Sequence, residues 1–135
     1  IAGLETRPVD DNLVPKVTFC EPEIASVGLS EAKAKDKYGA DAVVTSEFNV
    51  AGNAKSQILG TQGFVKLVAL KDGPIVGFHA IGARMGEQVG EGQLMVTWEA
   101  YADDVAALVH AHPTQNETLG EAAMALAGKP LHNHG

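Results

Sequence analysis

The stretch GFVKLVALKDGPIVGFHAI, residues 63–81, carries the clearest secondary-structure signal in the chain. Residues 64–70 alternate between two faces of a strand, with Phe64, Lys66, Val68 and Leu70 on one face and Val65, Leu67 and Ala69 on the other. The turn-forming residues KDGP follow at 71–74, and a second β-rich run covers residues 75–81. Alternation on both sides of a turn is typical of an antiparallel hairpin. This hairpin predicts that the fold is organised around an antiparallel sheet.

The segments on either side of the hairpin add further strands and helices. Short strands are expected at residues 14–19, 24–29 and 42–48. Helices are expected at residues 31–38, 87–101 and 115–127, with a further short helix that starts at Asp103. Ser30 and Gly39 are suitable capping residues for the first helix. Residues 49–60 have no clear period, and we expect an irregular connection with a short helical turn near Ala54. The predicted fold is α+β, an antiparallel sheet of about five strands with helices mainly on one face.

Length and composition predict one globular domain. A chain of 135 residues with 45% hydrophobic and 20% charged residues can form a single core. Residues 1–12 contain Pro8 and an acidic pair, and we interpret them as a linker or the remnant of a preceding domain. The domain itself is expected to cover residues 13–135.

Charge and cysteine content exclude several classes of function. The net charge of −7 leaves no basic surface for nucleic acid, and no apolar run is long enough to span a membrane. Cys20 is the only cysteine, so no disulfide forms within the chain, and a reducing, cytoplasmic location is expected. The five histidines lack a zinc-binding spacing, so no metal site is predicted.

Glycines are abundant in residues 82–92, but they do not match a phosphate-binding fingerprint. We expect Gly82, Gly86 and Gly90 at positions where the backbone approaches another element too closely for a side chain.

The segment HAHPTQNE, residues 110–117, concentrates the reactive side chains. His112 and Glu117 could form a general base with a carboxylate that orients its ring. Alternatively, Thr114 and Glu117 have the spacing of a helix capping box. Both interpretations remain open from the residues alone. The bond between His112 and Pro113 is a candidate for the cis form, which a proline peptide adopts at modest cost.

The sequence HAHPT followed by Glu117 resembles the C-terminal signature of the flavin-dependent pyridine nucleotide-disulfide oxidoreductases. With His110 it most resembles the dihydrolipoamide dehydrogenases of that family, because glutathione and thioredoxin reductases usually have an aliphatic residue there. FCEPEIASVGLSE, residues 19–31, is similar to the segment that opens the family's interface domain, and residues 61–82 to its central hairpin. The resemblance implies that residues 13–135 are an interface (dimerisation) domain.

The resemblance also implies a homodimeric enzyme that oxidises protein-bound dihydrolipoamide, with NAD as final acceptor. FAD and NAD would bind to further domains of the same protein, and a lipoyl domain of a 2-oxo acid dehydrogenase complex would be the partner. His112 would act as base with Glu117 supporting its charge, and His112 and Pro113 would lie near the partner subunit's flavin. His110 would be structural.

Two alternatives remain at this point. The same domain could come from a glutathione- or mercuric-reductase-like enzyme, or it could be a purely structural dimerisation module. With one cysteine the chain cannot supply a redox disulfide, so we expect it to be inactive alone. The dimerisation surface is expected on the final helix and the neighbouring glycine-rich segment.

Overall fold

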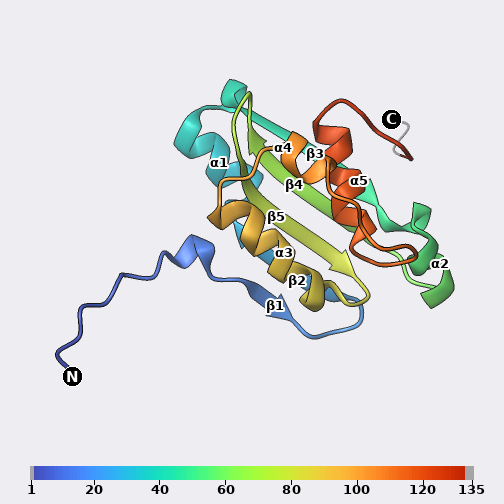
Figure 1. Cartoon of the computed structure of the whole chain (residues 1–135), viewed down its shortest axis with the longest axis horizontal. Helices are drawn as coiled ribbons and strands as arrows, with labels where there is room; N and C mark the ends of the chain where they lie inside the picture. The colour runs from blue at the N-terminus through green and yellow to red at the C-terminus, as the bar shows by residue number, and fades with distance from the viewer. Residues whose placement is uncertain (1, 133–135) are drawn as a thin grey trace.

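The structure, a computed structural model, describes residues 2–132 and is built around one antiparallel sheet (Figure 1). The strands of this described part lie in the order β1-β2-β5-β4-β3. They are β1 (Lys16–Thr18), β2 (Glu23–Gly28), β3 (Val43–Asn49), β4 (Phe64–Leu70) and β5 (Ile75–Gly82). The predicted α+β class with about five strands is confirmed.

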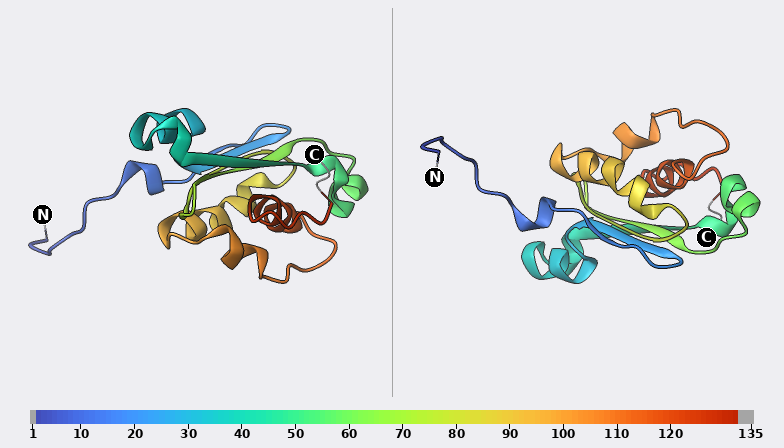
Figure 2. Two further views of the ribbon diagram at one scale, coloured as in Figure 1. Left: turned by 90° about the horizontal axis from the view of Figure 1, so that it is seen from above. Right: turned by 90° about the horizontal axis from the view of Figure 1, so that it is seen from below.

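The helices of the described residues connect these strands and follow them. They are α1 (Glu31–Tyr38), α2 (Ala54–Leu59), α3 (Met85–Thr97), α4 (Ala102–Ala106) and α5 (Glu117–Leu126), with 3-10 turns η1 (Asp11–Leu13), η2 (Ala40–Ala42) and η3 (Val50–Gly52). Figure 2 shows α3, α4 and α5 on one face of the sheet and α1 on the other. The expectation that helices cover mainly one face is therefore confirmed.

The β4–β5 hairpin forms as the sequence predicts. Leu67 pairs with Phe78 across the two strands, and both side chains are fully buried against the helical layer. Leu119 of α5 and Val89 of α3 lie in the same core cluster. Burying an apolar side chain of this size contributes roughly 1.5–3 kcal/mol, so this layer dominates the stability of the fold.

Close approach of α3 to the sheet also depends on Gly92, which was not among the glycines expected. A Cβ atom at Gly92 would lie 2.6 Å from the Phe78 ring, whereas nothing lies within 4 Å of a Cβ at Gly90. The prediction for Gly90 is therefore wrong, because this position faces open space. The predictions for Gly86 and Gly82 are confirmed, because an added Cβ atom would lie 3.1 Å from the Glu23 carboxylate at Gly86 and 3.0 Å from the Met85 side chain at Gly82.

Helix α1 has the expected boundaries. The Ser30 hydroxyl accepts a hydrogen bond from a backbone N–H of the first turn, and Gly39 follows the last turn with φ 92°. Glu31 contacts Lys35, one turn along the helix, and Lys66 of β4 at 2.7 Å. The hydrogen bonds from Lys35 and then Lys66 lower the pKa of Glu31 from 4.5 to about 2. This carboxylate therefore links α1 to the sheet.

Three element boundaries differ from the predicted ones. A helix was expected over residues 87–101, but α3 ends at Thr97 because Glu99 has a φ of 54°, in the left-handed region. Strand β1 is only three residues long, and α5 begins at Glu117 instead of residue 115. The turn expected near Ala54 is confirmed as α2.

Helix α5 is largely internal to the chain. Residues 118–123 are all buried, and the Ser46 hydroxyl of β3 donates a hydrogen bond to the Ala122 carbonyl at 2.7 Å. These positions are used for packing within the subunit. A dimerisation surface on this helix is therefore limited to its remaining positions.

The N-terminal segment before η1 extends away from the sheet and its helices (Figure 1). Its interpretation as a linker, with the domain starting at residue 13, remains a prediction. None of the helices in residues 2–132 is long and apolar enough to cross a membrane.

Candidate active site

His112 and Glu117 lie together at the N-terminus of α5. The distance between His112 Nδ1 and Glu117 Oε1 is 2.8 Å, and the His112 side chain is 69% exposed while that of Glu117 is 24% exposed. A carboxylate can only accept a hydrogen bond, so His112 Nδ1 carries the proton. The Nε2 lone pair is then available to accept a proton, which is the arrangement required of a general base.

The second carboxylate oxygen of Glu117 has a structural role. Glu117 Oε2 accepts a hydrogen bond from the Thr114 N–H at 2.9 Å. The Thr114 hydroxyl does not complete a capping box, because it donates to the Ala111 carbonyl at 2.6 Å. The predicted capping box with Thr114 as N-cap is therefore wrong, because the N-cap of α5 is Asn116, which makes no side-chain cap hydrogen bond. One carboxylate still makes both contacts, since it orients the His112 ring and holds the Thr114 N–H.

The environment of Glu117 favours its ionised form. Burial disfavours the charge, but the hydrogen bonds from the Thr114 N–H and from His112 outweigh burial and lower the pKa of Glu117. The site therefore presents a carboxylate anion beside the imidazole, suited to stabilise an imidazolium.

The peptide bond between His112 and Pro113 is cis, as predicted. Both residues are exposed to solvent.

His110 is anchored on the other side of the segment. Its Nε2 lies 2.8 Å from Glu91 Oε1, and the Asn116 side-chain amide donates to Glu91 Oε2 at 2.6 Å. The hydrogen bond with Glu91 outweighs burial and raises the pKa of His110. Gly120 leaves room for the ring, because a Cβ there would lie 2.8 Å from His110 Nδ1.

Glu91 belongs to this site although nothing in the sequence predicted it, since it lies in the middle of α3. Burial opposes the charge of Glu91, but the hydrogen bonds from His110 and Asn116 lower its pKa. Its carboxylate therefore connects both ends of the segment that carries His112. No spacing in the sequence could have indicated this role, because Glu91 precedes His110 by 19 residues and meets it only through tertiary packing.

A second histidine–carboxylate pair lies one turn further along α5. His132 Nδ1 is 2.5 Å from Glu121 Oε1, and the His132 N–H donates to Glu121 Oε2 at 3.1 Å. Both residues line a cavity of about 120 Å³ together with His112 and Glu117. The sequence predicted no such role for the C-terminal residues.

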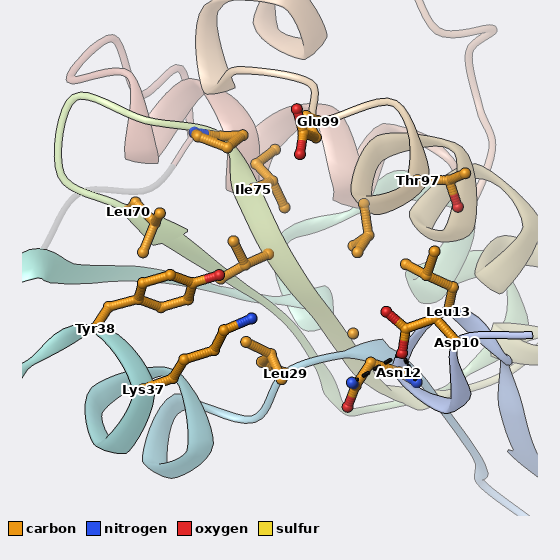
Figure 3. Close-up of a pocket in the computed structure, with 14 residues that line it drawn as sticks. Asp10, Asn12, Leu13, Leu29, Lys37, Tyr38, Leu70, Ile75, Thr97 and Glu99 are labelled. Carbon is orange, nitrogen blue, oxygen red and sulfur yellow. Dashed lines mark hydrogen bonds between the residues drawn. The ribbon is translucent and has the colours of Figure 1, made fainter.

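A larger cavity of about 280 Å³ lies elsewhere (Figure 3). It is lined by the segment before β1, by Lys37 and Tyr38 of α1, and by Thr97 and Glu99 at the end of α3. None of its lining residues belongs to segment 110–117, so it is separate from the site at His112. Within residues 2–132 there is no cluster of three or more metal-binding side chains.

Comparison with known proteins places this geometry in a family. Residues 14–123 match the model of the pyridine nucleotide-disulphide oxidoreductase dimerisation domain. The chain is 41% identical over 131 residues to a dihydrolipoyl dehydrogenase of Mycobacterium tuberculosis, which covers 95% of this chain and 28% of that protein. It is 40% identical over 134 residues to one from Bacillus subtilis, covering 98% of this chain and 28% of that protein.

Solved structures share the fold. LpdA from Mycobacterium tuberculosis superposes with a TM-score of 0.82 at 24% identity, covering 92% of this chain and 27% of that one. The HOCl-induced flavoprotein disulfide reductase RclA from Escherichia coli gives a TM-score of 0.75 at 17% identity, covering 82% of this chain and 25% of that one.

The chain spans about 28% of the length of the curated relatives named above. The family model covers most of the described chain, from before β1 into α5, and includes the whole sheet and the pair of His112 and Glu117. The chain therefore belongs to the family of pyridine nucleotide-disulphide oxidoreductase dimerisation domains.

Proposed function

We propose that this chain is the interface domain of a homodimeric dihydrolipoyl dehydrogenase, and that His112 and Glu117 are an acid/base pair acting in the partner subunit's active site. The 2.8 Å contact between His112 Nδ1 and Glu117 is the observation that carries this proposal. The relatives at about 40% identity that are named dihydrolipoyl dehydrogenase support the choice of substrate.

The chemical role of this chain is a proton transfer. A dihydrolipoyl thiol has a pKa near ~8.5 when unperturbed, and the thiolate is the nucleophile in disulfide exchange. His112 Nε2 takes the thiol proton, leaving the electron pair on sulfur. Nδ1–H remains bonded to Glu117, whose negative charge stabilises the imidazolium formed.

The redox chemistry would come from FAD and NAD bound to other domains of the same protein. The sequence contains no glycine-rich dinucleotide-binding fingerprint, so the residues of this chain do not fit either cofactor. Cys20 is the only cysteine, so a redox disulfide must also come from elsewhere. We expect the chain alone to be inactive, with His112 and Pro113 beside the partner subunit's flavin.

The substrate would arrive on a lipoyl domain of a 2-oxo acid dehydrogenase complex. The exposed ring of His112 supports this proposal, because a lipoyl group on a carrier protein needs an accessible base. A single cysteine, unpaired within the chain, suits a cytoplasmic location.

A structural dimerisation module is the second candidate, and one contact favours it. The hydrogen bond from the Thr114 N–H to Glu117 would exist even if the carboxylate were only a helix cap. A glutathione- or mercuric-reductase-like parent is less well supported, because the relatives above at about 40% identity are named dihydrolipoyl dehydrogenase.

Complementation between subunits would test the proposal. One full-length subunit carries His112→Gln and the other carries Ser in place of a redox cysteine in its flavin domain. If His112 acts across the interface, the mixed dimer keeps one complete site. A random mixture contains half mixed dimers, so about a quarter of wild-type turnover is expected. Each variant alone should lose roughly 10²-fold or more.

Flavin content and dimer size serve as controls in this experiment. Wild-type turnover by the His112→Gln homodimer would refute the role of His112 and leave the structural module. Loss of activity without recovery in mixed dimers would show that His112 acts within its own subunit.

A further inference from the structure

The segment before α2 is hydrogen-bonded to the loop that carries His112. Asn53 is 5% exposed, and its side-chain Nδ2 donates a hydrogen bond to the Thr114 carbonyl at 3.0 Å. In Figure 1 the green α2 region and the loop leading into α5 lie side by side, although they are about sixty residues apart in sequence. The contact therefore connects an otherwise peripheral helix to the site.

The orientation of the Asn53 amide is determined by its second partner. Asn53 Oδ1 accepts a hydrogen bond from the Ser56 N–H at 2.9 Å and so caps α2. A backbone N–H can only donate, so this side of the amide must be the oxygen. The NH₂ group must then face the Thr114 carbonyl, which can only accept.

Two more buried side chains close a ring of hydrogen bonds around this contact. The Ser56 hydroxyl lies 2.9 Å from Gln115 Oε1 and donates to it, while Gln115 Nε2 donates to the Ala83 carbonyl at 3.2 Å. Ser56 is fully buried and Gln115 is 3% exposed. Buried polar groups that are all paired hold their segments in one arrangement.

Thr114 is consequently held by all of its polar groups. Its N–H donates to Glu117, its hydroxyl donates to Ala111, and its carbonyl accepts from Asn53. The carbonyl belongs to the peptide that leads towards α5, so its direction determines how Glu117 is presented to His112. Displacing this peptide would separate the ring from its carboxylate.

From these contacts we propose that Asn53 is a positioning residue, which fixes the Thr114 carbonyl and thereby keeps Glu117 within hydrogen-bond distance of His112. Asn53 does not touch substrate and acts only through Thr114. The inference rests on the proposed function for its effect on turnover, and on geometry alone for its effect on the contact between His112 and Glu117.

The substitution Asn53→Asp separates positioning from helix capping. Aspartate still caps α2 through one oxygen, but it sets a second oxygen against the Thr114 carbonyl where a donor stood. Asn49→Asp is the matched control, because it makes the same chemical change in the same segment. Asn49 is exposed and caps η3 by accepting a hydrogen bond from the Ala51 N–H. Asn53→Ser, which also caps but cannot reach Thr114, covers the case in which Asn53→Asp does not fold.

Turnover is measured in the full-length enzyme with dihydrolipoamide and NAD. We expect Asn53→Asp, or Asn53→Ser, to lower kcat roughly 10- to 100-fold and Asn49→Asp to leave it unchanged. In a Glu117→Gln background the Asn53 substitution should lower kcat less than about 2-fold further, because both act on one contact. Unchanged kcat, or the same loss in both backgrounds, overturns the proposal.

A crystal structure of the same variant gives a readout that does not depend on activity. We expect the Thr114 carbonyl to turn away from residue 53 and the 2.8 Å distance between His112 and Glu117 to lengthen beyond hydrogen-bond range. An unchanged distance overturns the inference. If His112→Gln retains turnover, the proposed function fails, but this structure still decides the role of Asn53.

Discussion

Glu91 shows how a single carboxylate can organise a loop. It is partly buried on α3 and receives hydrogen bonds from His110 and Asn116, which bracket His112 in sequence. The contact between Glu91 and His110 raises the pKa of His110 and, together with the hydrogen bond from Asn116, outweighs burial and lowers the pKa of Glu91. The pair is therefore charged on both sides over a wider pH range than two isolated side chains would be.

These shifts predict a pH optimum for stability. The pKa of Glu91, Glu117 and Glu31 is lowered by folding, so their contribution is present above 4.5 and is lost as pH falls through the folded values. The pKa of His110 is raised, so its contribution is present below 6.5 and is lost as pH rises through the folded value. We expect the free energy of unfolding to be highest between about pH 4.5 and 6.5.

Urea unfolding of the 135-residue chain between pH 3 and 8 would measure this profile. Glu91→Gln should flatten its alkaline side, because His110 then loses its charged partner. Glu31 should contribute little in spite of its shift, since exposed ion pairs are screened by solvent. A wild-type stability that keeps rising from pH 5 to 8 would contradict the assignment to His110.

Helix α3 illustrates how one missing side chain determines the distance between a helix and a sheet. A Cβ at Gly92 would overlap the Phe78 ring, while one at Gly90, two residues earlier, would meet open space. We expect Gly92→Ala to destabilise the chain by about 1–3 kcal/mol through overpacking. Gly90→Ala should instead stabilise it by roughly 0.5–1 kcal/mol, since alanine is the better helix former.

The two variants control for each other, because both make the same change in the same helix. Chemical denaturation at neutral pH would measure the change in the free energy of unfolding for each variant. Equal effects of the two substitutions would show that α3 does not approach Phe78 as closely as described.

Elements that depend on local signals could be predicted from the sequence. The capping residues Ser30 and Gly39 determined α1, and alternation around the turn at 71–74 determined the hairpin. The end of α3 could not be predicted, because nothing local distinguishes Glu99, whose left-handed φ ends the helix. The apolar pattern continues past it, so the expected helix was too long.

Only the part of the site that is local in sequence could be predicted. His112, Pro113 and Glu117 are close in sequence, and a family resemblance could recognise them. Asn53 reaches the site from the N-cap of α2 and Glu91 from α3, and no spacing in the sequence brings them there. Their roles follow from tertiary packing, which a single sequence does not reveal.

The strand order also determines the time course of folding. The turn at 71–74 closes β4 on β5 at a low entropy cost, and only η3 and α2 separate β3 from β4. Strand β2 pairs with β5 across all of the intervening chain, so we expect this pairing to be the last to form within the sheet. Pulsed hydrogen-exchange labelling during refolding should show protection in β4 and β5 before β2; simultaneous protection would contradict this order.

Helix α3 contacts β2 and β5 together. We therefore expect Glu91 to be held beside His110 only after β2 has paired with β5, so that the part of the molecule proposed to do chemistry is assembled late.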